Sequence, residues 1–244
     1  MQATPLFYRD VVPLDRNDHG NFFLAPKTDY YYTAQSNAVF LAAVEFRRAA
    51  QEYPIVFGDD GSNVFPVAVL GLRDQENLYL APDGQWNAGY IPAYVRRYPF
   101  ILSSQPGSNN LAVCLDQSYP GVNQEGRGDA LFNNGVESEF LKQSLDFLMD
   151  YQGQYVRTIA LGKRLKDLGI LETMQANVEM SNGARLNLTG FLVVNRERLI
   201  NLPPETLGEM AKDGSLELVY LHLFSMETFA GLVQKLASRN NTAN

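Results

Sequence analysis

The chain has 244 residues, of which 45% are hydrophobic and 19% are charged, a composition typical of a folded globular protein and far from a disordered one. Its formal net charge of −7 argues against a general nucleic-acid-binding protein, since such proteins carry a surplus of Lys and Arg. Cys114 is the only cysteine, which excludes an intramolecular disulfide and a cysteine-based zinc cluster.

The N-terminal part is predicted to contain short strands and one helix. Residues 11–26 have the pattern of two short strands joined by a polar turn. From Tyr31 to Ala50 the apolar residues recur at intervals close to a helical turn, without Pro or Gly, so we expect a helix. Pro54 disfavours helical geometry at Tyr53, and the β-rich run 55–57 follows.

An antiparallel meander is expected next, from three runs that polar connectors separate: 64–72, 77–81 and 85–91. The connector Pro82-Asp83-Gly84 combines a preset φ with a residue that tolerates positive φ, which is typical of a turn. Residues 92–98 are predicted to form a short helix that Pro99 follows, because Pro92 suits a first helical turn. Residues 111–116 are a further predicted strand.

The segment from Ser118 to Gly135 is rich in Gly, Asn and acidic residues and is predicted to be a long loop. It is our candidate for a mobile lid or for a domain boundary. A boundary there would divide the chain into an N-terminal part, residues 1–117, and a C-terminal part, residues 136–240. One compact domain is the alternative.

The C-terminal part begins with a helical pattern that predicts one long helix, or two shorter ones broken near Gly153, with Gly169 as the stop signal. Beyond it, Ser181-Asn182-Gly183 lies between two alternating apolar runs, which strongly indicates a β-hairpin. A short helix is expected over 203–212.

The tail from Leu216 onward is also expected to be helical, with Ser225 as a possible cap or break. Strands and helices do not alternate regularly along the chain as they would in a doubly wound fold. The sequence therefore predicts an α+β fold, a mostly antiparallel sheet with packed helices.

Two pairs of adjacent arginines, one of them Arg96 and Arg97, each lie near the end of a predicted helix that a Tyr-Pro dipeptide follows. The helix dipole favours cations there by ~0.3–1 kcal/mol each, so a structural role is the first interpretation. Alternatively, Arg96 and Arg97 bind a carboxylate or phosphate beside Tyr94 and Tyr98. A third interpretation is a protein-interaction hot spot, since Arg and Tyr dominate such spots.

Most motifs for nucleotide binding and catalysis are missing, including a P-loop, a dinucleotide-binding fingerprint and a nucleophile elbow. His19 and His222 are the only histidines, and neither has a second histidine at zinc-ligand spacing. Residues 15–20 begin like a calcium loop, but Pro26 stands where the closing Glu would be, so we expect a turn. We therefore predict no metal and no cofactor.

His222 and Cys114 are two further candidate functional residues. His222 lies in the apolar run LVYLHLF and is expected to be a packed, hydrogen-bonded imidazole, with ligand binding as the alternative. Cys114 lies in LAVCLD and is expected to be an inert buried thiol. No motif supports an enzyme.

The location of the protein is predicted from what the N-terminus lacks. It has no basic segment followed by an apolar core, the mark of a secretory signal. No apolar stretch approaches the ~20 residues that a membrane span needs, so we expect none. The expected location is the cytoplasm, with signal-independent export as the alternative.

The ordered segments VPLDRNDHG, AAVEFRRAAQEYPIVF, FPVAVLGLRDQENLYLAPDGQWNAGYIPAYVRRYPF, NLTGFLVVNRERLINLP and ELVYLHLFSMETFAGLV resemble the SapC family of bacterial proteins. The resemblance extends from about Val11 to Leu236, and the Tyr-Pro blocks are its most specific parts. The family takes its name from a genetic locus for a bacterial surface layer, which implies a role in assembly or secretion of that layer. It has no agreed catalytic residues to carry over.

Our leading hypothesis is a non-enzymatic bacterial accessory protein that binds a protein or small-molecule partner, in surface-layer biogenesis or transport. The alternative is an enzyme or enzyme partner with an anion-binding pocket. Its candidate ligand-binding residues are Arg96, Arg97, Tyr98, Tyr94 and His222. A third hypothesis is a structural surface component that self-associates as a homo-oligomer through an exposed apolar patch.

Overall fold

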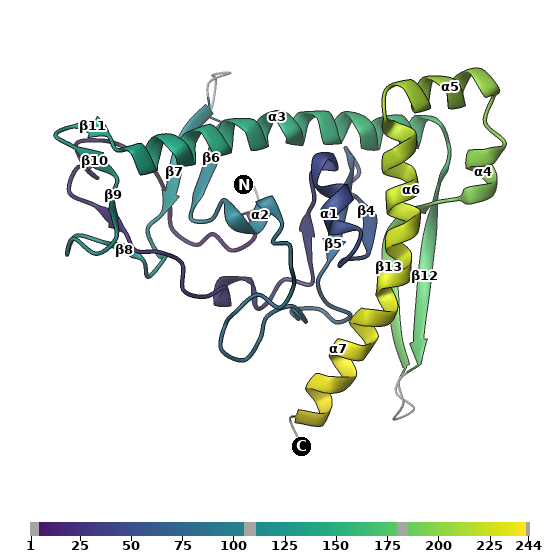
Figure 1. The fold of residues 1–244 in the computed structure, drawn as a ribbon, viewed down its shortest axis with the longest axis horizontal. Coiled ribbons are helices and arrows are strands. Elements are labelled where there is room, and N and C mark those ends of the chain that lie inside the picture. Colours follow the sequence, from purple (N-terminus) through teal and green to yellow (C-terminus); the bar gives the residue numbers. More distant parts are fainter. Residues whose placement is uncertain (1–4, 105–110, 180–184, 243–244) are drawn as a thin grey trace.

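One long helix, α3 (Glu139–Asp167), runs along one side of the molecule, and sheets and shorter helices lie against it (Figure 1). The computed structural model describes residues 5–104, 111–179 and 185–242. Every strand pair in these ranges is antiparallel. With helices packed on these sheets, the predicted α+β class is confirmed.

The largest sheet has five strands in the order β12-β13-β4-β5-β3. Their bounds are β3 (Ala38–Phe40), β4 (Ile55–Asp59), β5 (Val64–Val69), β12 (Leu171–Glu179) and β13 (Arg185–Val194). The predicted hairpin is present as β12 and β13, in which Val178 lies opposite Leu186. Its turn, Ser181-Asn182-Gly183, lies outside the described residues. Because β13 pairs with β4, strands from distant parts of the chain share one sheet.

Smaller sheets lie at the other end of α3 (Figure 1). Their strands are β1 (Val11–Pro13), β2 (Phe23–Leu24), β6 (Phe100–Ser104), β7 (Leu111–Asp116), β8 (Val122–Asn123), β9 (Asp129–Ala130), β10 (Phe132–Asn133) and β11 (Val136–Glu137). The strand orders are β1-β7-β6, β8-β2-β9 and β10-β11. The predicted strands near the N-terminus and over 111–116 are confirmed, while the predicted loop 118–135 contains three two-residue strands.

The predicted helix from Tyr31 to Ala50 is wrong. This segment forms the 3-10 turns η1 (Tyr31–Thr33) and η2 (Ala43–Glu45), the strand β3 and the single-turn helix α1 (Phe46–Ala49). The reason is tertiary: β3 pairs with β5, and the Leu41 N–H donates to the Pro66 carbonyl at 3.0 Å. An apolar spacing close to 3.6 residues cannot exclude a short strand whose hydrogen-bond partners come from elsewhere.

Of the three runs of the predicted meander, only the first forms a regular strand, β5, and it pairs with β4 and β3 and not with the run 77–81. Strands β4 and β5 form a hairpin, but the runs 77–81 and 85–91 are joined only by an isolated bridge between Leu80 and Trp86. Side-chain hydrogen bonds also order this segment. The side-chain oxygen Oδ1 of Asn77 accepts from the Tyr79 N–H at 2.9 Å. Asn77 Nδ2 also donates to Thr33 Oγ1 at 2.9 Å. Local polar contacts therefore replace the expected strand pairing.

The remaining helices agree with the sequence prediction, except for α4, which was not predicted. They are α2 (Ala93–Arg96), α4 (Arg196–Ile200), α5 (Pro204–Lys212), α6 (Ser215–Ser225), the 3-10 turn η3 (Met226–Thr228) and α7 (Phe229–Thr242). Helix α3 continues unbroken through Gly153, and Gly169, at φ +65°, follows its end as predicted. Gly162 lies where α3 crosses β5. A Cβ at this position would be 1.8 Å from the Val64 carbonyl oxygen, so the close contact of helix and strand requires a glycine.

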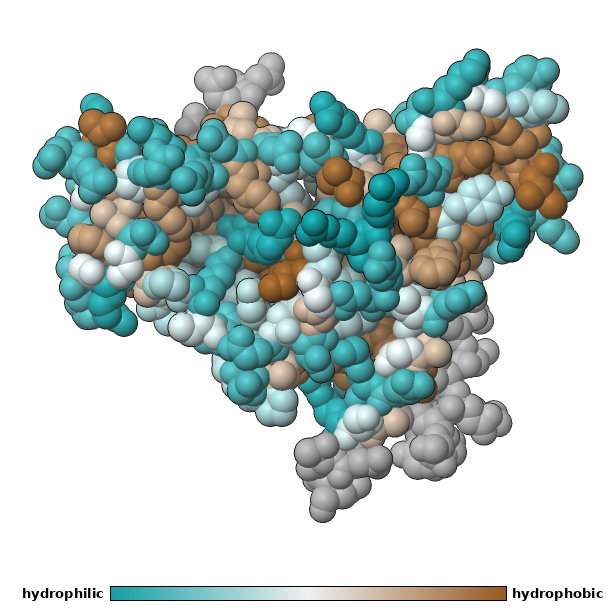
Figure 2. Space-filling view, in the orientation of Figure 1, coloured by the Kyte–Doolittle hydropathy of each residue, from teal (hydrophilic) through white to brown (hydrophobic). Residues whose placement is uncertain are grey.

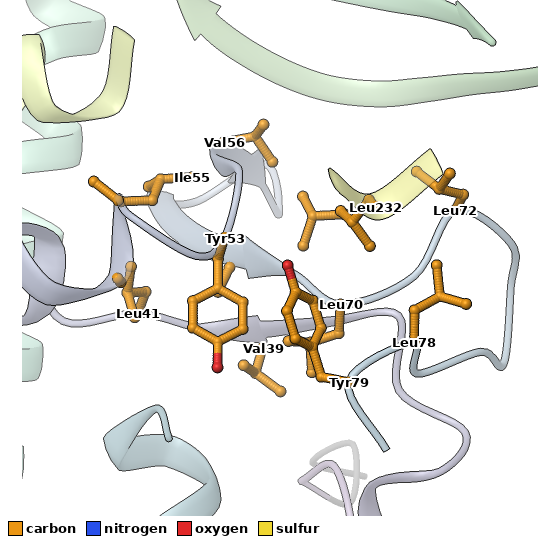
Figure 3. Close-up of a cluster of buried hydrophobic side chains, with 14 of the residues drawn as sticks. Val39, Leu41, Tyr53, Ile55, Val56, Leu70, Leu72, Leu78, Tyr79 and Leu232 are labelled. Carbon is orange, nitrogen blue, oxygen red and sulfur yellow. The ribbon is translucent and has the colours of Figure 1, made fainter. Parts of the chain in front are cut away.

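The main hydrophobic core lies between the five-stranded sheet and α7. Figure 3 shows Tyr53 and Tyr79 side by side within it, with ring centroids 4.6 Å apart and hydroxyl groups pointing in opposite directions. Tyr53 accepts a hydrogen bond from Trp86 Nε1 at 2.8 Å, and Tyr79 donates to the Glu52 carbonyl at 2.5 Å. Leu232 of α7 closes this core. Burial of these rings is the main favourable term of folding here.

The helical segment Ser215–Asn240 is, by length and composition only, long and apolar enough to cross a membrane, in contrast to our expectation of no such stretch. Core helices of soluble proteins meet the same criterion, so this is weak evidence for a span. Leu232 and Leu236 of this segment are buried, whereas Tyr220 and Phe224 are 45% and 55% exposed. Figure 2 shows apolar residues gathered over α5 and α6 on this face.

Candidate functional site

Both arginines of the second Tyr-Pro block line a cavity of about 300 Å³. The cavity lies between α2, α3 and the segment 24–27. Three basic residues, Lys27, Arg96 and Arg97, contribute to its lining, and among the described residues there Asp129 is the one acid. The apolar part of the wall consists of Leu24, Pro26, Pro99, Phe100, Phe140, Phe147 and Leu148. The cavity therefore combines an excess of positive charge with an apolar surface.

Arg96 is the exposed cation of this cavity. Its guanidinium carbon lies 5.1 Å from the centre of the Phe147 ring and 5.9 Å from that of Tyr90. Its Nε donates to the Ile91 carbonyl at 3.0 Å. Contact with two rings holds a long side chain at a defined place, and cation–π attraction of this kind contributes about 0.5–1 kcal/mol at exposed sites.

Arg97 is surrounded by tyrosines rather than by carboxylates. Its guanidinium carbon lies 4.1 Å from the ring centre of Tyr94, 4.9 Å from that of Tyr151 and 5.8 Å from that of Tyr8. Within the described part of the chain, its Nε is buried without a hydrogen-bond partner. Such orphaned buried donors are rare in native interiors, and an anion bound beside Arg97 would satisfy this one.

Lys27 completes the set of cations. Its Nζ donates to the Arg96 carbonyl at 2.7 Å and lies 6.0 Å from the centre of the Tyr32 ring. Burial, helped by the nearby positive charge of Arg96, lowers the pKa of Lys27 to about 7. No ion pair found in the described ranges includes Lys27, Arg96 or Arg97. An anion in the cavity would favour the charged form of all three side chains.

Glu45 holds α2, and with it both arginines, against the core. Its buried carboxylate accepts from the Ala42 N–H at 2.8 Å, the Ala93 N–H at 2.7 Å and the Tyr90 hydroxyl at 2.7 Å. Burial raises the pKa of Glu45, although these hydrogen bonds and Arg96 act in the opposite direction. Because its oxygens are occupied, Glu45 positions α2 and does not neutralise the arginines at close range.

The first arginine pair has a different environment. Arg47 forms an exposed ion pair with Glu217, 2.8 Å from Nη2 to Oε1, and Arg48 is exposed. Both arginines lie in the last turn of α1, where the helix dipole favours them. The structural interpretation made for both pairs therefore describes the first pair well. The second pair also lies at a helix end, but its guanidinium groups lie over aromatic rings.

The two predicted tyrosines have separate surroundings. Tyr94 contacts the Arg97 guanidinium and packs edge-to-face on Phe7, with ring centres 5.5 Å apart. Tyr98 lines the cavity, stacks on Tyr32 at 4.3 Å and donates from its hydroxyl to Asp116 at 3.3 Å. Burial raises the pKa of both tyrosines. Tyr98 is therefore a rigid wall residue, and Tyr94 is a support for Arg97.

His222 lies away from the cavity, inside the packed interface between α6 and the five-stranded sheet. It is fully buried. Its Nε2 accepts from the Val194 N–H at 3.0 Å, so Nδ1 carries the proton and donates to the Ile55 carbonyl at 2.7 Å. Burial lowers the pKa of His222 to about 4. This is the packed, hydrogen-bonded imidazole expected from its apolar run.

The other candidate positions are structural. Asp15 accepts from the Asn17 N–H at 2.7 Å, which is the local turn expected in place of a calcium loop. In the described ranges no group of three His, Cys, Asp or Glu residues is placed to hold a metal ion. Cys114 is buried, and burial raises the pKa of its thiol, as an inert cysteine requires.

Sequence reasoning found the arginines but not Lys27. Lys27 follows Pro26 in a polar connector, and its local sequence gives no sign of a binding residue. Only the tertiary fold brings its Nζ to the Arg96 carbonyl, 69 residues away along the chain. A lysine between Pro and Thr in a connector is ordinarily a solvated side chain, which is why no local pattern could have identified it.

The fold and the cavity define an α+β protein whose described residues include a cationic, aromatic-walled cavity. The family model described as SapC matches residues 14–232, so the chain belongs to the SapC family. No curated protein and no solved structure matches the chain. The resemblance inferred from the Tyr-Pro blocks is confirmed.

Proposed function

We propose that this SapC-family protein is a non-enzymatic accessory protein that binds an anionic group of a partner in the cavity of Lys27, Arg96 and Arg97. The partner is a small molecule or a protein that presents such a group. One observation carries the proposal: three basic residues line one cavity, and none of them belongs to an ion pair found among the described residues.

Electrostatics supports this proposal. Partly buried charges in proteins are normally paired, because removing a charge from water without compensation is costly. Here Lys27 and Arg96 each donate to a backbone carbonyl and all three cations contact aromatic rings, but none of them forms an ion pair found among the described residues, and Arg97 Nε has no partner there. The net charge of −7 makes this local excess of positive charge a specific feature and not a consequence of composition. Guanidinium groups suit carboxylates and phosphates because their fork of donors matches two oxygens.

We place this binding function in surface-layer biogenesis or transport, which rests on the family name alone. The partner would then be a component of that layer or of its export. The proposed role in surface-layer biogenesis or transport is tested by cross-linking in the native host. The partners recovered with the wild type and with Arg96→Ala are compared. Recovery of layer components that depends on Arg96 supports it, and an Arg96-dependent partner from an unrelated process contradicts it.

A second candidate function is catalysis, and Lys27 favours it. A lysine whose pKa is near 7 is neutral often enough to act as a base or nucleophile. Its amine faces a cavity that could hold a reacting group. The test is substrate turnover by the wild type and by Lys27→Met. If Lys27→Met abolishes turnover but still binds anions, the protein is an enzyme and not a non-enzymatic accessory protein.

Isothermal titration calorimetry of the full chain with small anions tests the binding proposal. We expect saturable binding that Arg96→Ala weakens about tenfold or more, because charge-assisted hydrogen bonds contribute ~1.5–3 kcal/mol. Arg157→Ala is the matched control, since Arg157 is an exposed arginine on α3 outside the cavity. Absence of binding by any anion, or equal losses in both variants, overturns the proposal.

A further inference from the structure

The walls of the cavity carry information about the body of the ligand, beyond its charge. Besides the cations, the lining includes Phe140 and Phe147, with the Arg96 guanidinium over the Phe147 ring, and also Leu24 and Leu148. Leu24 and Leu148 are buried members of a hydrophobic cluster that Phe140 joins. An inorganic anion would leave this apolar wall in contact with water, whereas a ligand with carbon groups would cover it.

Size narrows the ligand further. A volume of about 300 Å³ is at the lower end of the range for small-molecule sites. A cavity of this size favours a compact ligand with few non-hydrogen atoms over a nucleotide or a long-chain lipid.

We propose that the ligand is a small organic acid whose carboxylate binds Lys27 and Arg96 and whose flat apolar or aromatic body packs on Phe147. This inference rests on the proposed anion-binding function and assigns its ligand class. Its basis is the placement of cation and ring: the Arg96 guanidinium carbon is 5.1 Å from the centre of Phe147. A single ligand can therefore contact the charge and the ring together.

Charge balance agrees with a carboxylate. The two guanidinium groups and the Lys27 amine face one acidic side chain, Asp129, in the lining. The rings of Tyr94, Tyr151 and Tyr8 surround the Arg97 guanidinium, whose buried Nε has no partner among the described residues, so Arg97 adds positive charge and one unsatisfied donor to the site. Lys27 and the more exposed Arg96 are the cations that we expect to meet a carboxylate directly.

Calorimetry with four probes tests the ligand class: acetate, phenylacetate, phenylacetamide and inorganic phosphate. We expect phenylacetate to bind about tenfold more tightly than acetate, because it buries a ring. Phenylacetamide should bind about tenfold more weakly than phenylacetate, because it lacks the charge. Phenylacetate should also bind more tightly than phosphate.

Two variants of α3 locate the apolar contact. Phe147→Ala should remove most of the advantage of phenylacetate over acetate, while acetate binding should weaken much less, because Arg96 keeps its contact with Tyr90 and its hydrogen bond to the Ile91 carbonyl. Met149→Ala is the control, because Met149 is 59% exposed on the same helix and outside the cavity lining. Circular dichroism of both variants checks that α3 stays folded.

The outcomes separate this inference from the function on which it rests. If acetate, phosphate and phenylacetate bind with equal affinity and Arg96→Ala weakens the binding of all three, the organic-acid class is wrong but the anion-binding function stands. Equal affinity for phenylacetate and phenylacetamide also overturns the class, because charge would then play no part. If no probe binds at all, both the class and the anion-binding function fail.

Discussion

Lys27 Nζ donates a 2.7 Å hydrogen bond to the backbone carbonyl of Arg96, which joins the segment before η1 to the last residue of α2. This contact places an amine and a guanidinium in the wall of one cavity. Burial and the nearby charge of Arg96 both disfavour the ammonium form, and they lower the pKa of Lys27 to about 7. The contact therefore fixes part of the geometry of the cavity, while burial and the neighbouring cation set the charge of the amine.

The affinity for a carboxylate should depend on pH through Lys27. Because its pKa is about 7, Lys27 carries its charge below that pH and loses it above. We expect phenylacetate to bind more tightly at about pH 6 than at about pH 9, by up to roughly tenfold. Calorimetry at both pH values measures the difference.

Lys27→Arg is the control for this pH effect, since an arginine stays charged throughout the range. Arg96 and Arg97 also keep their charge, burial raises the pKa of the Tyr98 and Tyr32 hydroxyls, and Asp129 is the acid in the lining. A pH dependence that persists unchanged in Lys27→Arg would assign the effect to another group.

His222 should make the protein sensitive to acid. Its pKa is about 4 in the folded protein and near 6.5 when unfolded, so the unfolded state binds more protons between these values. The free energy of unfolding should therefore fall as pH falls from about 6.5 to about 4, by on the order of 3 kcal/mol. Urea unfolding across this range measures it.

A His222→Gln variant should be less stable at neutral pH, because the glutamine cannot reproduce the bonds to Val194 and Ile55. It should also lose the part of the pH dependence that His222 causes. His19→Gln, which changes the other histidine, serves as the control. If His19→Gln flattens the profile and His222→Gln does not, the assignment to His222 is wrong.

Two glycines of α3 should respond oppositely to alanine. Gly162→Ala would put a Cβ 1.8 Å from the Val64 carbonyl oxygen, so helix and strand must separate, at a cost of about 3 kcal/mol or more. Gly153→Ala meets nothing within 4 Å and should stabilise the helix by about 0.5–1 kcal/mol. Thermal unfolding of both variants tests the pair. A stable Gly162→Ala protein would contradict the packing of α3 on β5.

Glu45 should couple stability to ligand binding. Glu45→Gln replaces an acceptor of three hydrogen bonds with a side chain whose amide nitrogen cannot accept, so we expect a loss of roughly 1–3 kcal/mol. Binding of phenylacetate should weaken as well, because the Ala93 N–H begins the helix that carries both arginines. The exposed Glu227→Gln is the control. Unchanged binding in a destabilised Glu45→Gln protein would show that α2 is held by other contacts.

The elements that the sequence predicted correctly are those with strong local signals. Helix α3 has a long apolar period and a glycine after its end, and the β12–β13 hairpin has Asn-Gly between alternating runs. The wrong predictions concern segments whose local sequence pattern is weak or fits both a helix and a strand. Residues 31–50 have helical spacing, yet β3 forms because β5 offers it a hydrogen-bonded edge.

By itself, the sequence determined the α+β class, the SapC family, the long helix, the C-terminal hairpin and the place of Arg96 and Arg97 near a helix end. These properties follow from residue spacing and turn chemistry, which act over a few neighbouring residues. The tertiary structure alone decided that Lys27 meets Arg96, that Glu45 holds α2, and that His222 lies outside the cavity lining. Such contacts join residues distant along the chain, and no local pattern encodes which distant partner a side chain will meet.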